Sequence, residues 1–179
     1  MIRAFAAIPL PEDIRARLEV LAQMLPLPRR IAPENLHLTL VFLGELPEDV
    51  LEEVHLEFQR LHADPFALTL RGIGTFGGGK PRSVHAEVAP EPALEALQAR
   101  VEAAARRAGA PVEARRFVPH VTLARLRPGA VEPARLERAI LELAGFSAGP
   151  FAVDHFALFR SHLGRDGAHY EELARYGLS

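Results

Sequence analysis

Three short motifs each occur twice in the 179-residue sequence, in the same order and roughly 80 residues apart. One match of this length is weak evidence, but three in one order are hard to obtain by chance. The pairs are Pro-Leu-Pro at 9–11 with Pro-Glu-Pro at 90–92, His-Leu-Thr-Leu at 37–40 with His-Val-Thr-Leu at 120–123, and Pro-Phe-Ala at 65–67 with the same triplet at 150–152. The repeat predicts one duplicated unit, approximately residues 1–80 and 81–179, within a single bilobal domain.

The hydrophobic pattern divides each unit into strand, helix, strand, helix and strand. Apolar stretches predict the strands, and Pro followed by acidic residues marks the first turns of helices. The predicted strands cover 2–8, 36–43, 66–76, 83–89, 117–126 and 151–160, and the predicted helices cover 11–24, 91–108 and 132–144, with another opening at 47. Residues 170–176 fit a strand or a helix, and a strand is favoured. A Gly-Gly-Gly-Lys-Pro break at 77–81 falls near the boundary between the copies.

This order of elements predicts an α+β fold with two pseudo-symmetric lobes. Each lobe is expected to be a mostly antiparallel sheet with helices on its outer face. The strand after the first helix of each unit carries a His-x-Thr motif, so the two motifs are expected to face each other. The groove between the lobes is therefore the expected active site.

The composition excludes several classes of protein. A hydrophobic content of 49% and a net charge of −2 exclude an intrinsically disordered chain. The absence of cysteine excludes disulfides, thiolate nucleophiles and thiolate metal sites. No apolar run is long enough to span a membrane, and the N-terminus lacks a signal peptide's apolar core, so a cytoplasmic protein is expected. Lys80 is the only lysine among 21 basic residues, which is typical of a GC-rich genome, and the 15 prolines favour a thermophile.

The two His-x-Thr motifs are the candidate chemistry. Side chains alternate between the faces of a strand, so His37 and Thr39 share one face while the flanking leucines share the other. His120 and Thr122 repeat this arrangement. A solvent-facing strand with incidental polar residues is the alternative for one motif alone, but recurrence of both residue types at the matching place of a repeat favours function.

Paired imidazoles suit phosphodiester chemistry. With an unperturbed pKa of about 6.5, one imidazole can take a proton from an attacking oxygen while the other gives a proton to the leaving oxygen. Threonine hydroxyls can donate to the nonbridging oxygens of the phosphate. The sequence has no His-Glu-x-x-His zinc motif, no Walker-type phosphate loop and no Gly-x-Ser-x-Gly elbow. No metal, ATP or acyl-enzyme chemistry is indicated.

Five runs of the sequence carry a resemblance to a known family. The runs ENLHLTLVFLG and FVPHVTLAR, with RAFAAI, GTFGGGKPRSV and SHLGRDGAHYEEL elsewhere in the chain, resemble the two-histidine phosphoesterase superfamily. More narrowly, they resemble the bacterial and archaeal RNA 2′,3′-cyclic phosphodiesterases, also called 2′-5′ RNA ligases. The resemblance implies a central groove, no metal or nucleotide cofactor, and metal-independent opening of RNA 2′,3′-cyclic phosphate ends to 2′-phosphates. Some members also join tRNA halves through a 2′-5′ linkage.

The resemblance also implies roles for individual residues. His37 is the expected proton donor and His120 the expected proton acceptor, with Thr39, Thr122 and Arg125 binding the phosphate. Phe5 is a candidate for stacking on the terminal base, with a place in the core as the alternative. The chain departs from the family pattern where Gly77, Gly78 and Gly79 replace a proline region and where His85 stands in place of a tryptophan, which leaves the base preference open.

Other candidates carry weaker signals. Four arginines precede the motif strands and could hold an RNA backbone, although solvation is the simpler role: Arg29, Arg30, Arg115 and Arg116. His55 and His62 are expected on a helix surface, and a metal cluster of His155, His162 and His169 is disfavoured by their irregular setting.

The expected partners are RNA ends or nucleotides with a 2′,3′-cyclic phosphate, handled by a monomer that binds no membrane. The alternatives to hydrolysis are 2′-5′ ligation, including that of tRNA halves, and a non-catalytic RNA-end-binding module.

Overall fold

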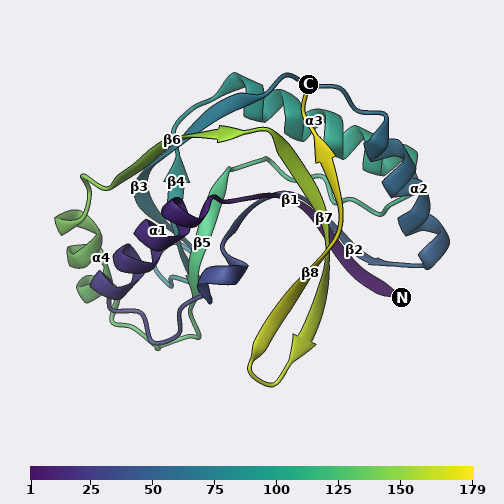
Figure 1. Cartoon of the computed structure of the whole chain (residues 1–179). Helices are drawn as coiled ribbons and strands as arrows, with labels where there is room; N and C mark the ends of the chain where they lie inside the picture. Colours follow the sequence, from purple (N-terminus) through teal and green to yellow (C-terminus); the bar gives the residue numbers. More distant parts are fainter.

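The computed structural model describes residues 1–179 as two four-stranded antiparallel sheets and four α-helices. The first sheet has the order β2-β1-β7-β8, from β1 (Ile2–Pro9), β2 (His37–Leu46), β7 (His155–Gly164) and β8 (Gly167–Gly177). The second has the order β5-β4-β3-β6, from β3 (Phe66–Phe76), β4 (Ser83–Val88), β5 (His120–Arg125) and β6 (Ser147–Val153). Figure 1 shows the two sheets splaying apart towards the bottom of the view. The α+β architecture predicted from the sequence is confirmed.

The helices begin where proline and acidic side chains predict them. Acidic residues occupy the first turns of α1 (Glu12–Met24) and α2 (Glu48–Gln59), where the helix dipole favours negative charge. Proline occupies the first turn of α3 (Pro92–Arg107) and α4 (Pro133–Glu142), where its missing N–H costs no helical hydrogen bond. Helices α2 and α3 pack together beside the first sheet, and α1 packs on β5 and β6 of the second. No helix is long and apolar enough to cross a membrane.

The sheets do not coincide with the two halves of the sequence. Strand β3, from the first half, pairs with β4 and β6, whereas β7 and β8, from the second half, complete the sheet of β1. The chain therefore crosses between the lobes, and α1 covers the sheet to which its preceding strand does not belong. The first Pro-Phe-Ala triplet leads into β3 and the second lies on β6, and these strands are direct neighbours in one sheet. This motif pair therefore does not mark equivalent places in two lobes. The duplication itself stays a prediction.

The remaining element predictions are confirmed to within a few residues, with four corrections. The predicted strand over 151–160 is two strands, β6 and β7, separated at Asp154. The predicted strand over 117–126 begins only at His120, and the favoured C-terminal strand starts at Gly167. The break at 77–81 is the turn of the β3–β4 hairpin, where Gly77 and Gly78 adopt φ of 108° and 60°. Such positive φ values favour glycine, so the triplet forms a turn within a lobe.

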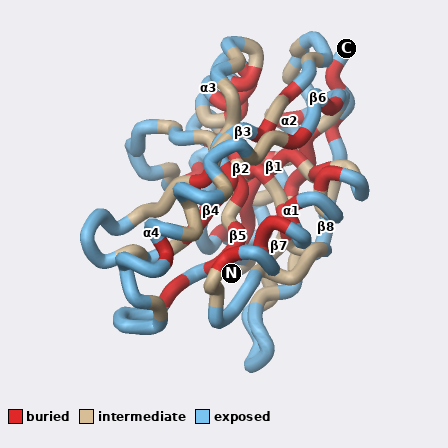
Figure 2. The backbone as a smooth tube through the Cα atoms, turned by 90° about the vertical axis from the view of Figure 1, so that its left-hand side faces the viewer, coloured by how far each residue is buried: buried red, intermediate tan, exposed pale blue.

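The motif strands bury one face and leave the other open. On β2, Leu38 and Leu40 are buried while His37 and Thr39 are partly exposed, and β5 repeats this pattern with Val121 and Leu123 buried. These leucines and valines belong to a core of 38 buried residues. Figure 2 shows the buried residues gathered along the strands, with exposed residues in the loops and at the tip of the β7–β8 hairpin. The predicted alternation is confirmed.

Candidate active site

The two His-x-Thr motifs lie on adjoining strands. β2 and β5 are the edge strands of the two sheets, and they contact each other. The chain leading into β2 also pairs with β5, because Ile31 N donates to Leu123 O at 2.8 Å and Arg30 forms an antiparallel bridge with Ala124. This backbone pairing joins the lobes at the place where both motifs lie.

Both motif histidines are anchored in the same way. His37 Nδ1 is 2.6 Å from Asn35 O, and His120 Nδ1 is 2.7 Å from Val118 O. A carbonyl oxygen only accepts hydrogen bonds, so Nδ1 carries the proton in each ring and Nε2 of the neutral imidazole keeps a lone pair. Thr39 Oγ1 lies 2.9 Å from His37 Nε2 and donates to it in this state. Each imidazole therefore has one anchored nitrogen and one that can exchange protons.

Burial sets the electrostatics of the pair. Desolvation is the main cause that lowers the pKa of both His37 and His120, and the hydrogen bonds from Nδ1 to the carbonyls offset part of this effect. The positive charge of Arg125 lowers both pKa values further, and a charge on His120 lowers that of His37. Arg125 is therefore close enough to both imidazoles for its charge to act on them, and its phosphate-binding role stays a prediction.

Phe5 lies beneath His37. Its ring centroid is 4.9 Å from that of His37, and Phe159 and Tyr170 lie 5.3 and 5.0 Å away. Only 4% of Phe5 is exposed, so neither ring face is open to a nucleobase. Of the two alternatives for Phe5, the structure matches the core residue. Its position supports the His37 imidazole from below.

Phe42 is the open aromatic that the sequence analysis missed. It is 59% exposed, pairs with Phe5 across β1 and β2, and lies 6.3 Å from the Phe5 ring. Strict alternation from Thr39 would place Phe42 in the core. The register between β1 and β2 shifts at Ala6/Ala7, and Leu40 and Val41 are buried in succession, as in a β-bulge. The bulge returns Phe42 to the face of His37, and alternation alone gave no signal for it.

His120 rests against two rings from the second sheet. The Phe76 ring is 4.9 Å away and the His85 ring 5.2 Å away, and these two stack on each other at 4.4 Å. His85 is only 4% exposed and lies across from Thr122 in the β4–β5 register. We call Phe76 and His85 the aromatic wall of His120.

The other histidines lie away from the motif pair. His55, expected on the surface, is partly buried, and its Nδ1 forms a hydrogen bond with Tyr176 Oη at 2.8 Å. His62 is exposed as predicted. His155 pairs with its neighbour Asp154, and His162 pairs with Glu171. No group of three or more His, Cys, Asp or Glu side chains is arranged to hold a metal ion.

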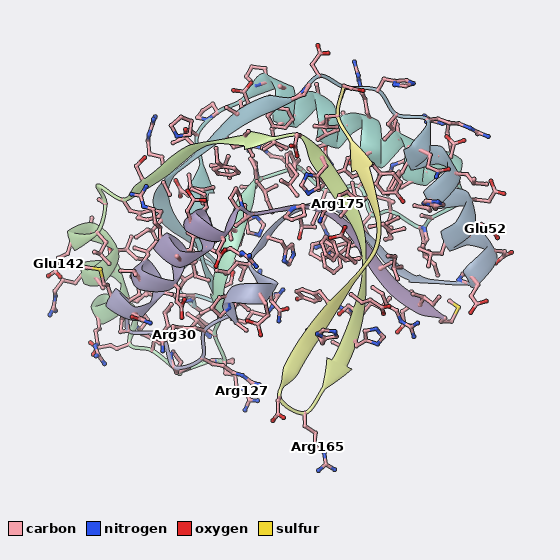
Figure 3. All side chains as sticks on the ribbon, in the orientation of Figure 1. Arg30, Glu52, Arg127, Glu142, Arg165 and Arg175 are labelled. Atoms are coloured by element: carbon pink, nitrogen blue, oxygen red, sulfur yellow. The ribbon has the colours of Figure 1, made fainter.

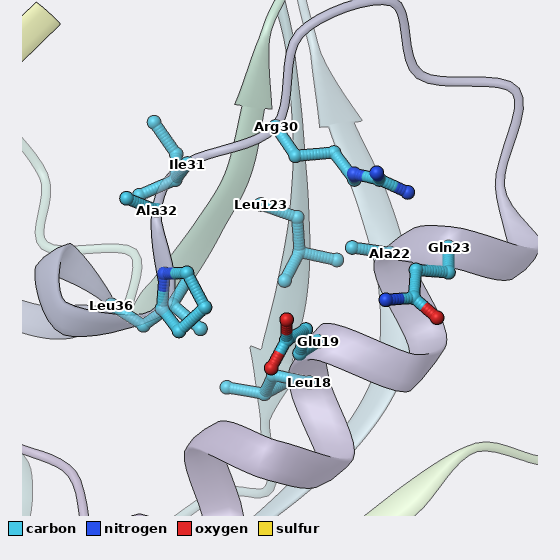
Figure 4. Close-up of a pocket in the computed structure, with 10 residues that line it drawn as sticks. Leu18, Glu19, Ala22, Gln23, Arg30, Ile31, Ala32, Leu36 and Leu123 are labelled. Carbon is cyan, nitrogen blue, oxygen red and sulfur yellow. The ribbon is translucent and has the colours of Figure 1, made fainter.

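The candidate arginines take different positions. Arg30 lines a cavity of about 210 Å³ between α1 and the lead-in to β2 (Figure 4). This cavity reaches Leu36 and Leu123 on the apolar side of the motif strands, so it is separate from the histidine pair. Arg115 pairs with Glu113 at 2.5 Å and is exposed. Figure 3 shows Arg127 and Arg165 at the lower end of the molecule, where the sheets splay apart.

Residues 10–165 match the family model of the 2′-5′ RNA ligase superfamily. The chain belongs to this superfamily. It is 37% identical over 190 residues to an RNA 2′,3′-cyclic phosphodiesterase of Thermus thermophilus, covering 99% of this chain and 90% of that protein. It is 30% identical over 183 residues to one of Bacillus subtilis, covering 98% and 96%.

Solved structures of the superfamily share the whole fold. Escherichia coli LigT complexed with 3′-AMP superposes with a TM-score of 0.82 at 32% identity, covering 99% of this chain and 98% of that one. TT0787 of Thermus thermophilus superposes with a TM-score of 0.79 at 32% identity, covering 98% and 97%. The family resemblance predicted from the motifs is confirmed.

Acid should destabilise this fold through His85. Burial lowers the pKa of His85 from 6.5 to about 4, so the unfolded chain binds more protons between these values and the free energy of unfolding falls as the pH falls through them. We expect His85 to account for a loss of about 2 kcal/mol between pH 7.5 and pH 5. Urea unfolding of the chain and of His85→Phe at both pH values measures it. The same pH dependence in both proteins would contradict a buried, neutral His85.

Proposed function

We propose that this protein hydrolyses RNA 2′,3′-cyclic phosphate ends to 2′-phosphates. The observation that carries the proposal is the matched pair of imidazoles on adjoining edge strands, each anchored through Nδ1 to a backbone carbonyl, which leaves Nε2 of each as the nitrogen that can exchange protons. The chain belongs to a superfamily whose relatives are named for this hydrolysis, and this membership supports the substrate class.

The bond that breaks, between phosphorus and the ribose 3′-oxygen, determines which histidine donates a proton and which accepts one. His120, neutral, takes a proton from water through Nε2 as the water oxygen attacks phosphorus. His37, protonated, gives its Nε2 proton to the ribose 3′-oxygen as the bond from that oxygen to phosphorus breaks. The phosphate stays on the 2′-oxygen. Each turnover leaves His120 protonated and His37 neutral, and exchange with solvent restores both.

Thr39 is placed to follow the state of His37. When His37 is neutral, the Thr39 hydroxyl donates to Nε2 across 2.9 Å. When His37 is protonated, Nε2 no longer accepts, and the hydroxyl is released to donate to a nonbridging oxygen of the phosphate. Thr122 occupies the matching position beside His120, and Arg125 supplies the positive charge that binds the phosphate.

Phe42 is the candidate surface for the nucleobase. It lies on the face of His37 and Thr39, and most of its surface is open. Stacking on an aromatic ring tolerates every base, because every base has a π-face. Phe42, rather than the buried Phe5, is therefore the ring that stacks on the base.

The same groups serve 2′-5′ ligation when an RNA 5′-hydroxyl takes the place of water, including at the ends of tRNA halves. Water is the more abundant nucleophile, so hydrolysis is the main reaction that we propose. Both imidazoles come from one chain, and a monomer is sufficient for it.

Removing either imidazole tests the reaction. We expect His37→Ala and His120→Ala each to lower kcat/KM for a 2′,3′-cyclic nucleotide by about 10²- to 10⁴-fold, with a much smaller effect on unfolding because both side chains are partly exposed. The exposed His62→Ala is the matched control. On an RNA with a cyclic end the product should carry a 2′-phosphate, and a 3′-phosphate product or a fully active His37→Ala would contradict the proposal.

The pH profile should reflect two lowered pKa values. Since burial and Arg125 lower the pKa of both histidines below 6.5, the bell-shaped profile of kcat/KM should reach its maximum on the acid side of that value. The substrate phosphate is negative and raises both pKa values, so the kcat profile should lie at higher pH. A kcat/KM that still rises above pH 8 would contradict the lowered pKa values of the two histidines.

Truncating Phe42 should weaken binding of the nucleoside. We expect Phe42→Ala to lower kcat/KM by about 5- to 150-fold, mainly through KM, because base stacking contributes about 1–3 kcal/mol. Phe42→Tyr keeps the ring and serves as the control. Steady-state kinetics with a 2′,3′-cyclic nucleotide measure both variants, and an unchanged KM in Phe42→Ala would place the base elsewhere.

Chelation tests whether protons alone carry the reaction. Imidazoles that exchange protons need no Lewis acid, so the rate should be unchanged after dialysis against excess EDTA. Loss of activity that Zn²⁺ or Mg²⁺ restores would overturn this mechanism.

A further inference from the structure

His85 is the one imidazole beside the motif pair that the proposed reaction does not use. Its ring lies 5.2 Å from that of His120 at an interplanar angle of 61°, and it stacks on Phe76 at 4.4 Å and 28°. It is almost fully buried, and its Nδ1 has no hydrogen-bond partner. A buried ring nitrogen without a partner is costly, so its presence beside a catalytic imidazole needs an explanation.

The two motif strands differ at this position. In the first sheet, β1 places Ala7 across from Thr39, and in the second, β4 places His85 across from Thr122. A methyl group in one sheet therefore corresponds to a large ring in the other. The His120 side of the pseudo-symmetric pair is supported from its neighbouring strand by a group that the His37 side lacks at this register.

The backbone of β3 is shaped around His85. Gly74 pairs with His85, and a Cβ at residue 74 would lie 2.7 Å from His85 Nε2 and 2.5 Å from Glu87 Oε1. Contacts this short do not occur between packed atoms, so glycine leaves the space that the ring and the carboxylate occupy. The His85 ring packs against Phe76, and the missing side chain at residue 74 leaves room for it.

The surroundings of His85 favour a neutral ring. The titratable groups near it are His120 on β5, whose ring it contacts, and Glu87 on its own strand. A carboxylate favours a charged imidazole, but Glu87 makes no hydrogen bond with His85, and both border the space beside Gly74. Burial and a charge on His120 both lower its pKa. When His120 accepts a proton, His85 does not compete for one, and it acts as an aromatic ring.

We propose that His85 is a positioning residue, which with Phe76 holds the His120 ring in the orientation from which its Nε2 takes the proton from water. This inference rests on the proposed function. It assigns no proton, no metal and no substrate atom to His85 and predicts that its shape and position matter while its nitrogens do not.

Two variants remove His85 from the aromatic wall by different routes. His85→Ala deletes the ring, whereas Gly74→Ala leaves His85 chemically intact and displaces it through the new Cβ. Both variants should raise the pKa of His120, which is the midpoint of its titration, because its ring becomes more exposed and water then stabilises the charged form. NMR of the imidazole protons in the full chain measures this midpoint without substrate. Both should also lower kcat/KM about 10- to 100-fold through misplacement of the base.

Two controls separate shape from chemistry. Gly79→Ala lies in the same hairpin, where a Cβ meets nothing within 4 Å, and should leave the His120 midpoint and kcat/KM unchanged. His85→Phe keeps a ring and removes the unpaired Nδ1, so it should retain kcat/KM to about twofold and resist urea better than the unchanged chain.

The results decide the inference separately from the proposed function. A His120 midpoint that does not move in His85→Ala or Gly74→Ala would overturn it, as would a His85→Phe as inactive as His85→Ala. If His85→Ala does not fold, Gly74→Ala and His85→Phe still give both answers. If the unchanged chain does not hydrolyse cyclic phosphates, the proposed function fails, while the NMR titrations still test the contact between His85 and His120.

Discussion

The site depends on one hydrogen bond made twice, from Nδ1 of a motif histidine to the carbonyl oxygen two residues earlier. This bond fixes the tautomer, because a carbonyl accepts and cannot donate. It also fixes the direction of the ring, because it restricts rotation about the side-chain bonds. Asn35, the residue that anchors His37, is held in turn by its own side chain, whose Nδ2 donates to Ala168 O on β8 at 2.8 Å. The anchoring of the imidazole therefore extends to the strand that carries Tyr170, whose ring packs against His37.

The crossing of the chain between lobes makes the pair of motifs rigid. A chain whose halves folded separately would join its lobes only through a linker, and each histidine would move with its own lobe. Here β3 extends the sheet of β4 and β5, while β7 and β8 extend the sheet of β1 and β2. The lead-in to β2 pairs with β5. Relative motion of the motifs would break backbone hydrogen bonds and expose core side chains, so the two His-x-Thr motifs are held in place relative to each other.

Much of this arrangement was predictable, because alternation along β2 and β5 and the repeat of His-x-Thr are local properties of the sequence. Three features were not. The bulge that exposes Phe42 depends on register with β1, the break at Asp154 depends on two different pairing partners, and the exchange of strands between lobes is a long-range choice. Whether Phe5 is buried or exposed to a ligand could not be predicted either, because it depends on the rings that other strands bring next to it. The contact between His85 and His120 depends on the pairing of β4 with β5, which only the structure shows.

The central claim is that both Nε2 atoms address one phosphate. A crystal structure of the protein with a bound 2′-nucleotide, the product of the proposed reaction, tests it most directly. The account predicts that oxygens of one phosphate lie within hydrogen-bond distance of Nε2 of His37 and of His120, with the base against Phe42. A phosphate that contacts only one of the two imidazoles, or that binds in the separate cavity beside Arg30, would contradict it.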